Sequence, residues 1–271
     1  MRIAFLVNRD IESVVALNLL LLDLARHELF VFVSDRVGGS TTAKSAAMLG
    51  QLGFIEQDLW NRVVFPSVEA APRNARLLSF DGVHRRLGVP VRPIASARTP
   101  EALDALAATG AELFISIRFG KILGAEAIGI PRRGVLNLHS GILPTYRGVL
   151  ATFRALMAGD SKIGCTLHRI DSPAIDTGPI MEIATTDVNP DRSLFWHILS
   201  LYPLGTAMIK RAVDRIDTGD DVYGTPQKAG EGSYFSFPTD EDLVRFTAKG
   251  WRLFDRSDLE ELLDGFGVPG A

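Results

Sequence analysis

The stretch that decides the fold is Asn137-Leu138-His139-Ser140-Gly141-Ile142-Leu143-Pro144-Thr145-Tyr146-Arg147-Gly148. Its first residues continue a β-rich run over 134–138. Side chains two positions apart on a strand share a face, so we expect Asn137 and His139 to point together. Two glycines and a proline over 140–148 predict a shaped loop. An amide and an imidazole at the carboxyl end of a strand stand where parallel α/β sheets place ligands.

On both sides of this stretch, short apolar runs alternate with helical patterns, which predicts a parallel α/β sheet. We expect strands over residues 3–7, 29–33, 112–117, 134–138, 164–170 and 179–185. We expect helices over residues 11–25, 120–128, 150–157, 193–216 with a kink at Pro203, and near 257–263, and one opened by Thr99-Pro100-Glu101 that ends before Gly110. The predicted organisation is one α/β domain over residues 1–217 and a C-terminal extension over residues 218–271.

The composition excludes several classes of protein. The 271 residues include 29 Lys plus Arg and 32 Asp plus Glu, without the positive excess that nucleic-acid binding requires. The single cysteine, Cys165, excludes an internal disulfide and a cysteine-based zinc site. No Gly-x-Gly-x-x-Gly follows residues 3–7, and no helix carries a two-histidine metal spacing. The longest apolar stretch, 14–24, is too short to cross a membrane, and no signal peptide opens the chain, so we expect a cytoplasmic enzyme.

Two further motifs follow the deciding stretch. Gly164-Cys165-Thr166-Leu167-His168 lies on a predicted strand, and Ile175-Asp176-Thr177-Gly178-Pro179 places an acid on a tight turn. A histidine beside a strand is more often structural than catalytic, and an Asp-Thr-Gly turn is usually only a turn because Asp bonds its own backbone. The spacing alone therefore favours a structural role for Asn137, His139 and Asp176 over a catalytic one.

In their order, these motifs resemble those of the folate-dependent formyltransferases, and most closely those of the sugar N-formyltransferases. That family has an Asn, an apolar residue, a His, a loop ending in Leu-Pro, an aromatic residue and a Gly. Downstream it has a Gly-x-Thr-like strand with a His, then an Asp before a Gly, as Gly164, His168, Asp176 and Gly178 stand here. The resemblance is strong over residues 112–185, weaker over the first 110 and faint after 190. It implies a Rossmann-like α/β fold and a 10-formyltetrahydrofolate-dependent N-formyltransferase.

The resemblance also implies roles for individual residues. Formyl transfer needs a donor for a developing oxyanion, a group that exchanges protons near neutral pH, and a carboxylate. Asn137, His139 and Asp176 are the expected catalytic residues in these roles. The family commonly has Pro and Ser after the His, and this chain has Ser140 and Gly141, which predicts a more pliable loop shaped for another acceptor.

The expected co-substrate is 10-formyltetrahydrofolate, and no metal is implied. The segment starting at Arg118 resembles the family's folate-pocket segment, and the loop over 170–176 would complete the pocket. The expected binding residues are Phe119, Gly120, Lys121, Ile122, Leu123, Ile170 and Asp171. Backbone groups would bind the pterin, since the side chains of Phe119, Ile122 and Leu123 fit a plain apolar core equally well.

The acceptor is expected to be a primary amine on a nucleotide-linked sugar, contacted by Arg9, Tyr146 and Arg147. Arg147 and Arg118 fit equally well as anion ligands or as partners of an acid. The turn over 8–12 has no glycine and two acids, which is a poor phosphate cradle for glycinamide ribonucleotide. Residues 211–271 hold 7 Lys plus Arg against 13 Asp plus Glu, and residues 218–271 are too few for the barrel of the tRNA-formylating members, so no nucleic-acid partner is expected.

Three alternatives stay open from the sequence. The first is a formyltransferase for another small amine, such as glycinamide ribonucleotide or an amino acid-like compound. The second is a hydrolase of 10-formyltetrahydrofolate, although the known hydrolases carry an N-terminal regulatory domain and this chain opens on a strand. The third is a folate-binding protein without catalysis, which the intact Asn, His and Asp set disfavours.

The remaining histidines and the aromatic tail have weaker signals. His168 is a candidate for supporting the catalytic residues from behind. His197 is expected to pack against its neighbours, and His27 and His84 are expected at the surface or at helix ends. The run over 234–237 (Tyr-Phe-Ser-Phe) fits packing on the domain, a homodimer contact or a stacking surface for the acceptor.

Overall fold

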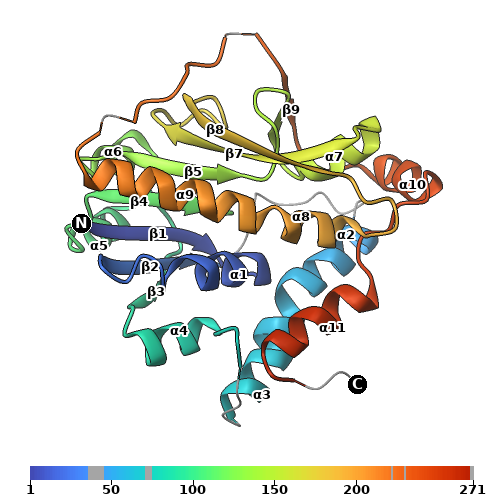
Figure 1. Cartoon of the computed structure of the whole chain (residues 1–271), viewed down its shortest axis with the longest axis horizontal. Helices are drawn as coiled ribbons and strands as arrows, with labels where there is room; N and C mark the ends of the chain where they lie inside the picture. The colour runs from blue at the N-terminus through green and yellow to red at the C-terminus, as the bar shows by residue number, and fades with distance from the viewer. Residues whose placement is uncertain (36–45, 71–74, 221, 229, 269–271) are drawn as a thin grey trace.

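The computed structural model describes residues 1–35, 46–70, 75–220, 222–228 and 230–268 (Figure 1). Its centre is a sheet with the strand order β3-β2-β1-β4-β5-β7-β8, flanked by helices, which confirms the α/β Rossmann-like class. The strands of this sheet are β1 (Arg2–Asn8), β2 (Glu28–Ser34), β3 (Val91–Pro93), β4 (Leu113–Ile117), β5 (Val135–His139), β7 (Lys162–Ile170) and β8 (Ile180–Asp187). The α-helices are α1 (Ile11–Leu20), α2 (Ala46–Gly53), α3 (Phe65–Ala70), α4 (Phe80–Leu87), α5 (Pro100–Ala107), α6 (Ala125–Gly129), α7 (Ala151–Ala158), α8 (Leu194–Ser200), α9 (Tyr202–Asp217), α10 (Asp240–Ala248) and α11 (Arg256–Gly265).

The sheet is mixed, which corrects the expected parallel sheet at one edge. Strands β3, β2, β1, β4 and β5 are parallel to their neighbours, but β7 pairs antiparallel with both β5 and β8. A loop over 171–179 joins β7 directly to β8, and strands joined by so short a connection pair antiparallel. This reversal sets the β7 side chains against the carboxyl end of β5.

Helices cover both faces of the sheet. Along β1, Ile3, Phe5 and Val7 face the larger apolar cluster, and Ala4 and Leu6 face the smaller one. The larger cluster lies under α1, α8 and α9, and α9 crosses the sheet in front (Figure 1). The smaller cluster lies under α5 and α6. A strand buried on both faces reads as a continuous apolar run, as residues 3–7 do.

Several element boundaries differ from the sequence prediction. The first helix ends at Leu20, and tightened turns with bonds such as Ala25 N to Leu22 O continue it to residue 26. The predicted helix over 120–128 is a loop up to Gly124, which caps α6, and the helix itself begins at Ala125. The predicted helix over 193–216 is two helices, α8 and α9. The break between them lies at the predicted kink, with Pro203 in the first turn of α9. Sequence reasoning assigned no element between residues 34 and 99, which holds α2, α3, α4, β3 and the π-helical turns Phe54–Asp58 and Trp60–Val64.

The segment after α9 packs on the rest of the chain at three places. Its strand β9 (Ser233–Phe235) pairs in parallel with β6 (Tyr146–Gly148), which belongs to the deciding stretch. The Phe246 ring of α10 stacks on Phe153 with ring centroids 4.5 Å apart. Phe266, directly after α11, contacts Trp60 with a centroid separation of 5.6 Å. No helix in the described ranges combines the length and apolarity needed to span a membrane.

Candidate active site

Four polar side chains meet at the carboxyl end of β5. Asn137 lies opposite His168 across β5 and β7, and its Nδ2 atom is 3.0 Å from His168 Nε2. The loop between β7 and β8 brings the Asp176 carboxylate to this place. Its Oδ2 atom lies 3.5 Å from Nδ1 of His139, and its Oδ1 atom lies 3.4 Å from Nε2 of His168. The structure therefore brings together Asn137, His139 and Asp176, and adds His168 to them.

The Asp176 side chain is only 10% exposed, and its neighbours favour the ionised form. Burial alone would raise its pKa, but the His139 charge, the hydrogen bond and charge of His168, and the Gly148 N–H lower the pKa to about 2. Gly148 donates its backbone N–H to Asp176 Oδ2 over 2.8 Å. The backbone of Asp176 has a left-handed φ of 55°, which is uncommon for a residue with a side chain. A strained, well-partnered carboxylate of this kind is typical of a functional site.

The partners of the two histidines fix where their protons are. Nε2 of His139 is 2.6 Å from the carbonyl oxygen of Tyr146, and a carbonyl only accepts, so Nε2 carries hydrogen. Nδ1 of His139 then faces the Asp176 carboxylate. Nδ1 of His168 donates in the same way to the carbonyl of Arg169 over 2.8 Å.

The loop after His139 is closely packed, which corrects the expectation of a pliable loop. A Cβ on Gly141 would lie 2.7 Å from His139 Nε2 and 2.4 Å from the Cβ of Ala151. Thr166 donates its hydroxyl to the Gly141 carbonyl over 2.7 Å and accepts the Leu143 N–H over 3.1 Å. Gly141 is therefore required by close approach, and the loop is held against β7.

The expected donor loop follows β4. Phe119, Leu123 and Ile170 belong to one apolar cluster, which brings the two predicted folate-binding segments together. Ile122 is exposed by 48%, and Ile175, in the facing loop, by 39%. In the part of the chain that the structure describes, the backbone groups of Phe119, Lys121 and Leu123 have no hydrogen-bond partner. The Gly120 N–H donates to Ser34 Oγ. Asp171, in the second predicted segment, is exposed.

Arg118 lies between the carboxyl ends of β1 and β4, where the strand order of the sheet reverses. It has a left-handed φ of 54°, and its guanidinium lies 2.8 Å from Asp10, 3.0 Å from Glu56 and 3.6 Å from Glu12. Burial raises the pKa of Glu12 well above its ordinary value. Of the two roles weighed for Arg118, the structure shows pairing with acids. Asp10 also accepts the Ser13 N–H at the start of α1, so this crevice is already filled by side chains.

The predicted acceptor residues have different surroundings. The Tyr146 side chain is buried and its hydroxyl donates to Asp160 over 2.7 Å, so only the backbone of Tyr146 reaches the site. Arg147 bonds the Glu231 carbonyl, and its Nε atom is buried without a partner in the described residues. Arg9 pairs with Asp35 over 3.6 Å and lies over the Phe80 ring.

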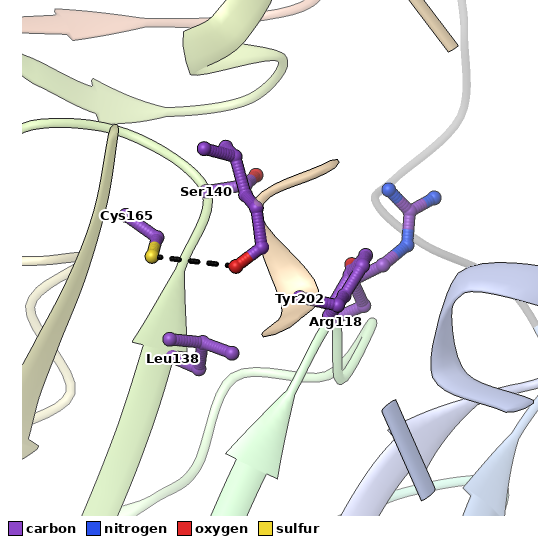
Figure 2. A pocket seen from close by; sticks show the side chains of 6 residues that line it. Arg118, Leu138, Ser140, Cys165 and Tyr202 are labelled. Atoms are coloured by element: carbon purple, nitrogen blue, oxygen red, sulfur yellow. Dashed lines mark hydrogen bonds between the residues drawn. The ribbon is translucent and has the colours of Figure 1, made fainter. Parts of the chain in front are cut away.

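A small cavity lies on the other face of β5 (Figure 2). It encloses about 10 Å³, room for about one water. Its lining residues are Arg118, Leu138, Ser140, Cys165, Leu201 and Tyr202. The Cys165 Sγ atom lies 3.7 Å from the Leu201 carbonyl oxygen, a contact drawn as the dashed line from Cys165 in Figure 2. The cavity is too small for a substrate, and the Cys165 thiol, whose pKa burial raises to about 12, is no nucleophile.

The chain is similar in sequence to known formyltransferases. A family model described as formyl transferase matches residues 66–195. A methionyl-tRNA formyltransferase from Cereibacter sphaeroides (strain ATCC 17023) is 35% identical over 207 residues, covering 68% of this chain and 67% of that protein. The chain belongs to the formyltransferase family. A methionyl-tRNA formyltransferase from Methylobacterium sp. (strain 4-46) is 34% identical over 172 residues, 63% of this chain.

The match to other formyltransferases is partial in length. The chain spans about half the length of the two Methylobacterium relatives, 55% and 51%. Among solved structures, a sugar N-formyltransferase from Shewanella sp FDAARGOS_354 has a TM-score of 0.55 at 14% identity, covering 90% of this chain and 86% of that one. A glycinamide ribonucleotide transformylase from Symbiobacterium toebii has a TM-score of 0.55 at 19% identity, covering 81% and 88%. At these identities the structures establish the formyltransferase fold.

The surroundings of the other histidines can be compared with those expected from the sequence. His168 contacts two of the predicted catalytic side chains, and the signal for it was its place on the strand that pairs with β5. His197 packs between Trp196 and Trp251, as expected. His84 is exposed in the last turn of α4. His27, expected at the surface or at a helix end, directly follows the helical turns after α1 and is buried beside the N-terminus. The described residues contain no group of three side chains that could hold a metal ion.

Proposed function

We propose that this protein transfers the formyl group of 10-formyltetrahydrofolate to a primary amine, with Asn137, His139 and Asp176 as catalytic residues. The observation that carries the proposal is the convergence of an amide, an imidazole and an ionised carboxylate at one strand end in a member of the formyltransferase family. An oxyanion donor, a proton-exchanging group and a carboxylate are the three functions that acyl transfer between amines needs.

The roles follow from the contacts. One amide N–H of Asn137 bonds His168, and the other is available for the oxygen that becomes negative during transfer. His139 holds a proton on Nε2, and donation to the substrate requires exchange of its bond to the Tyr146 carbonyl. Asp176 stabilises the imidazolium that forms when His139 takes up the proton of the attacking amine.

The donor fits the loop after β4. A pterin is flat and carries several amide-like donors and acceptors. The unpartnered backbone groups of Phe119, Lys121 and Leu123 can satisfy these groups, and the exposed side chains of Ile122 and Ile175 offer apolar contact. When bound, 10-formyltetrahydrofolate supplies the formyl group and takes back a proton on the leaving nitrogen.

The acceptor that we propose is an amine on a nucleotide-linked sugar. Arg147 and Tyr234 are paired positions on β6 and β9, directly beside Gly148. Among the described residues the Arg147 Nε atom has no partner, and a guanidinium fits phosphate oxygens. The Tyr234 ring is 57% exposed and would meet a base or sugar face. Glycinamide ribonucleotide is disfavoured, because Asp10 caps the start of α1 and no amide cradle is open there.

Aminoacyl-tRNA is the second candidate acceptor. The observation that favours it is the sequence identity of 34% and 35% to methionyl-tRNA formyltransferases. Against it stands the charge of residues 211–271, with 7 Lys plus Arg and 13 Asp plus Glu.

An acceptor screen tests the proposed function. The protein is mixed with 10-formyltetrahydrofolate and, in separate reactions, amino-sugar nucleotides, glycinamide ribonucleotide, free amino acids or methionyl-tRNA. We expect turnover that depends on an amino-sugar nucleotide. Turnover with methionyl-tRNA alone would contradict the proposed sugar acceptor but support the proposed formyl transfer. Turnover without any amine would show that the protein is a hydrolase. Binding of folate without turnover under any condition would contradict the catalytic proposal.

A further inference from the structure

Gln227 lies in the segment after α9 and contacts the turn that presents Asp176. Its Nε2 atom is 2.9 Å from the carbonyl oxygen of Asp176 and 2.8 Å from that of Gly178. A side-chain amide nitrogen has two hydrogens, so Gln227 donates one to each carbonyl. The two bonds clamp the backbone on both sides of Thr177, next to the catalytic carboxylate.

The turn needs such support because its backbone is strained. A left-handed backbone is unfavourable for a residue with a side chain, and it persists only when its surroundings enforce it. Gly178 is pressed against the chain, since a Cβ there would lie 1.9 Å from the Arg169 carbonyl oxygen. Ile180 and Thr225 exchange two backbone hydrogen bonds of 2.8 and 2.7 Å, which align the Gln227 segment along this loop.

The same C-terminal segment fixes the other partner of Asp176. Gly148 donates its N–H to Asp176, and the neighbouring Val149 N–H bonds the Phe235 carbonyl of β9 over 2.8 Å. A Cβ on Gly148 would lie 2.2 Å from that carbonyl oxygen. Residues after α9 therefore hold both the backbone of Asp176 and the peptide that binds its carboxylate.

From these contacts we propose that Gln227 is a positioning residue for formyl transfer, which holds the Asp176 turn so that the carboxylate faces His139 and His168. The inference rests on the proposed function. It predicts that loss of the two amide bonds lowers kcat and leaves folate binding nearly unchanged, because Gln227 contacts the catalytic turn and not the loop after β4.

Two substitutions separate hydrogen bonding from packing. Gln227→Asn keeps the amide donor on a shorter side chain, and Gln227→Glu keeps the length and removes the donor. Gln51→Glu, at an exposed position of α2, is the matched control for the change of charge. Each variant is measured for kcat, acceptor KM and folate Kd. The titration of the Asp176 carboxyl is followed by NMR without substrate.

We expect Gln227→Glu to lower kcat at least about tenfold, with folate Kd within about twofold, and Gln227→Asn to retain more activity than Gln227→Glu. In Gln227→Glu the pKa of Asp176 should rise from about 2 toward the ordinary aspartate value of about 3.9. The inference is overturned if both Gln227 variants match Gln51→Glu in kcat, or if Gln227→Glu is the more active of the two, as a packing role requires.

Other outcomes are also decisive. If Gln227→Glu does not fold, Gln227→Asn alone must lower kcat and raise the Asp176 pKa, and wild-type values in both would overturn the inference. If the wild-type protein transfers formyl to no acceptor, the proposed function fails, and the Asp176 titration still decides whether Gln227 positions the carboxylate.

Discussion

Asn137 and His168 face each other across β5 and β7, with 3.0 Å between Asn137 Nδ2 and His168 Nε2. Since Nδ1 of His168 donates to the Arg169 carbonyl, neutral His168 presents a lone pair on Nε2. That lone pair accepts one N–H of Asn137 and fixes the direction of the other. Under the proposed function, His168 therefore orients Asn137, the proposed oxyanion donor.

Removing His168 should impair turnover through Asn137. We expect His168→Leu to lower kcat roughly tenfold, which corresponds to about 1.4 kcal/mol, while folate binding persists. His84→Leu, at an exposed histidine, is the control and should leave kcat unchanged. Steady-state kinetics and folate titration measure both effects, and a wild-type kcat in His168→Leu would refute the orienting role.

A side chain at position 141 should disturb His139. In Gly141→Ala, the new Cβ would lie 2.7 Å from His139 Nε2 and 2.4 Å from the Ala151 Cβ, so either the ring or the start of α7 must move. We expect a loss of stability of about 1–3 kcal/mol and a fall in kcat of at least about tenfold. The matched control is Gly129→Ala in α6, where a Cβ meets nothing within 4 Å. Equal kcat and melting temperature for the two variants would contradict the close packing at Gly141.

The sequence predicted the grouping of Asn137, His139 and Asp176 better than it predicted the residues around them. The two-residue period of a strand was enough to place Asn137 and His139 on one face, and motif order joined Asp176 to them. His168 was underrated because its contact depends on the antiparallel register of β5 and β7, a long-range pairing that no local pattern encodes. The role of Gly141 was mistaken for flexibility, because the sequence does not show how close Ala151 comes.

The buried cluster around Arg118 was beyond sequence reasoning for a similar reason. Its partners Asp10, Glu12 and Glu56 come from α1 and a helical segment that no local pattern indicated. The charge of Arg118 was visible in the sequence, but the choice between an anion ligand and an acid partner depended on which segments fold against it.

The low pKa of Asp176 predicts a loss of stability in acid. Because the folded-state pKa of about 2 is below the ordinary value of about 3.9, the carboxylate stabilises the fold above about pH 4. That contribution, roughly 2–3 kcal/mol, is lost progressively as the pH falls from about 5 to about 1. We expect the free energy of unfolding of the wild type to fall by this much more than that of Asp176→Asn over this range. Urea denaturation at each pH measures it, with the exposed Asp187→Asn as control; parallel wild-type and Asp176→Asn curves would contradict the assignment.

The donor loop should be ordered by reduced folate. The backbone groups of Phe119, Lys121 and Leu123 lack partners among the described residues, so a bound pterin should slow hydrogen exchange over 119–123 and 170–176. Hydrogen-exchange mass spectrometry with and without 5-formyltetrahydrofolate measures this protection. Protection confined to other segments would show that the folate lies elsewhere.

The most direct test of the central claim follows the formyl group itself. Isotope-labelled 10-formyltetrahydrofolate is mixed with the pool of acceptor amines, and label in the amine product is measured for the wild type, His139→Asn and the control His84→Asn. We expect labelled product from the wild type and from His84→Asn, and at least about a hundredfold less from His139→Asn with folate binding retained. Equal labelling by His139→Asn and the wild type would contradict the central claim.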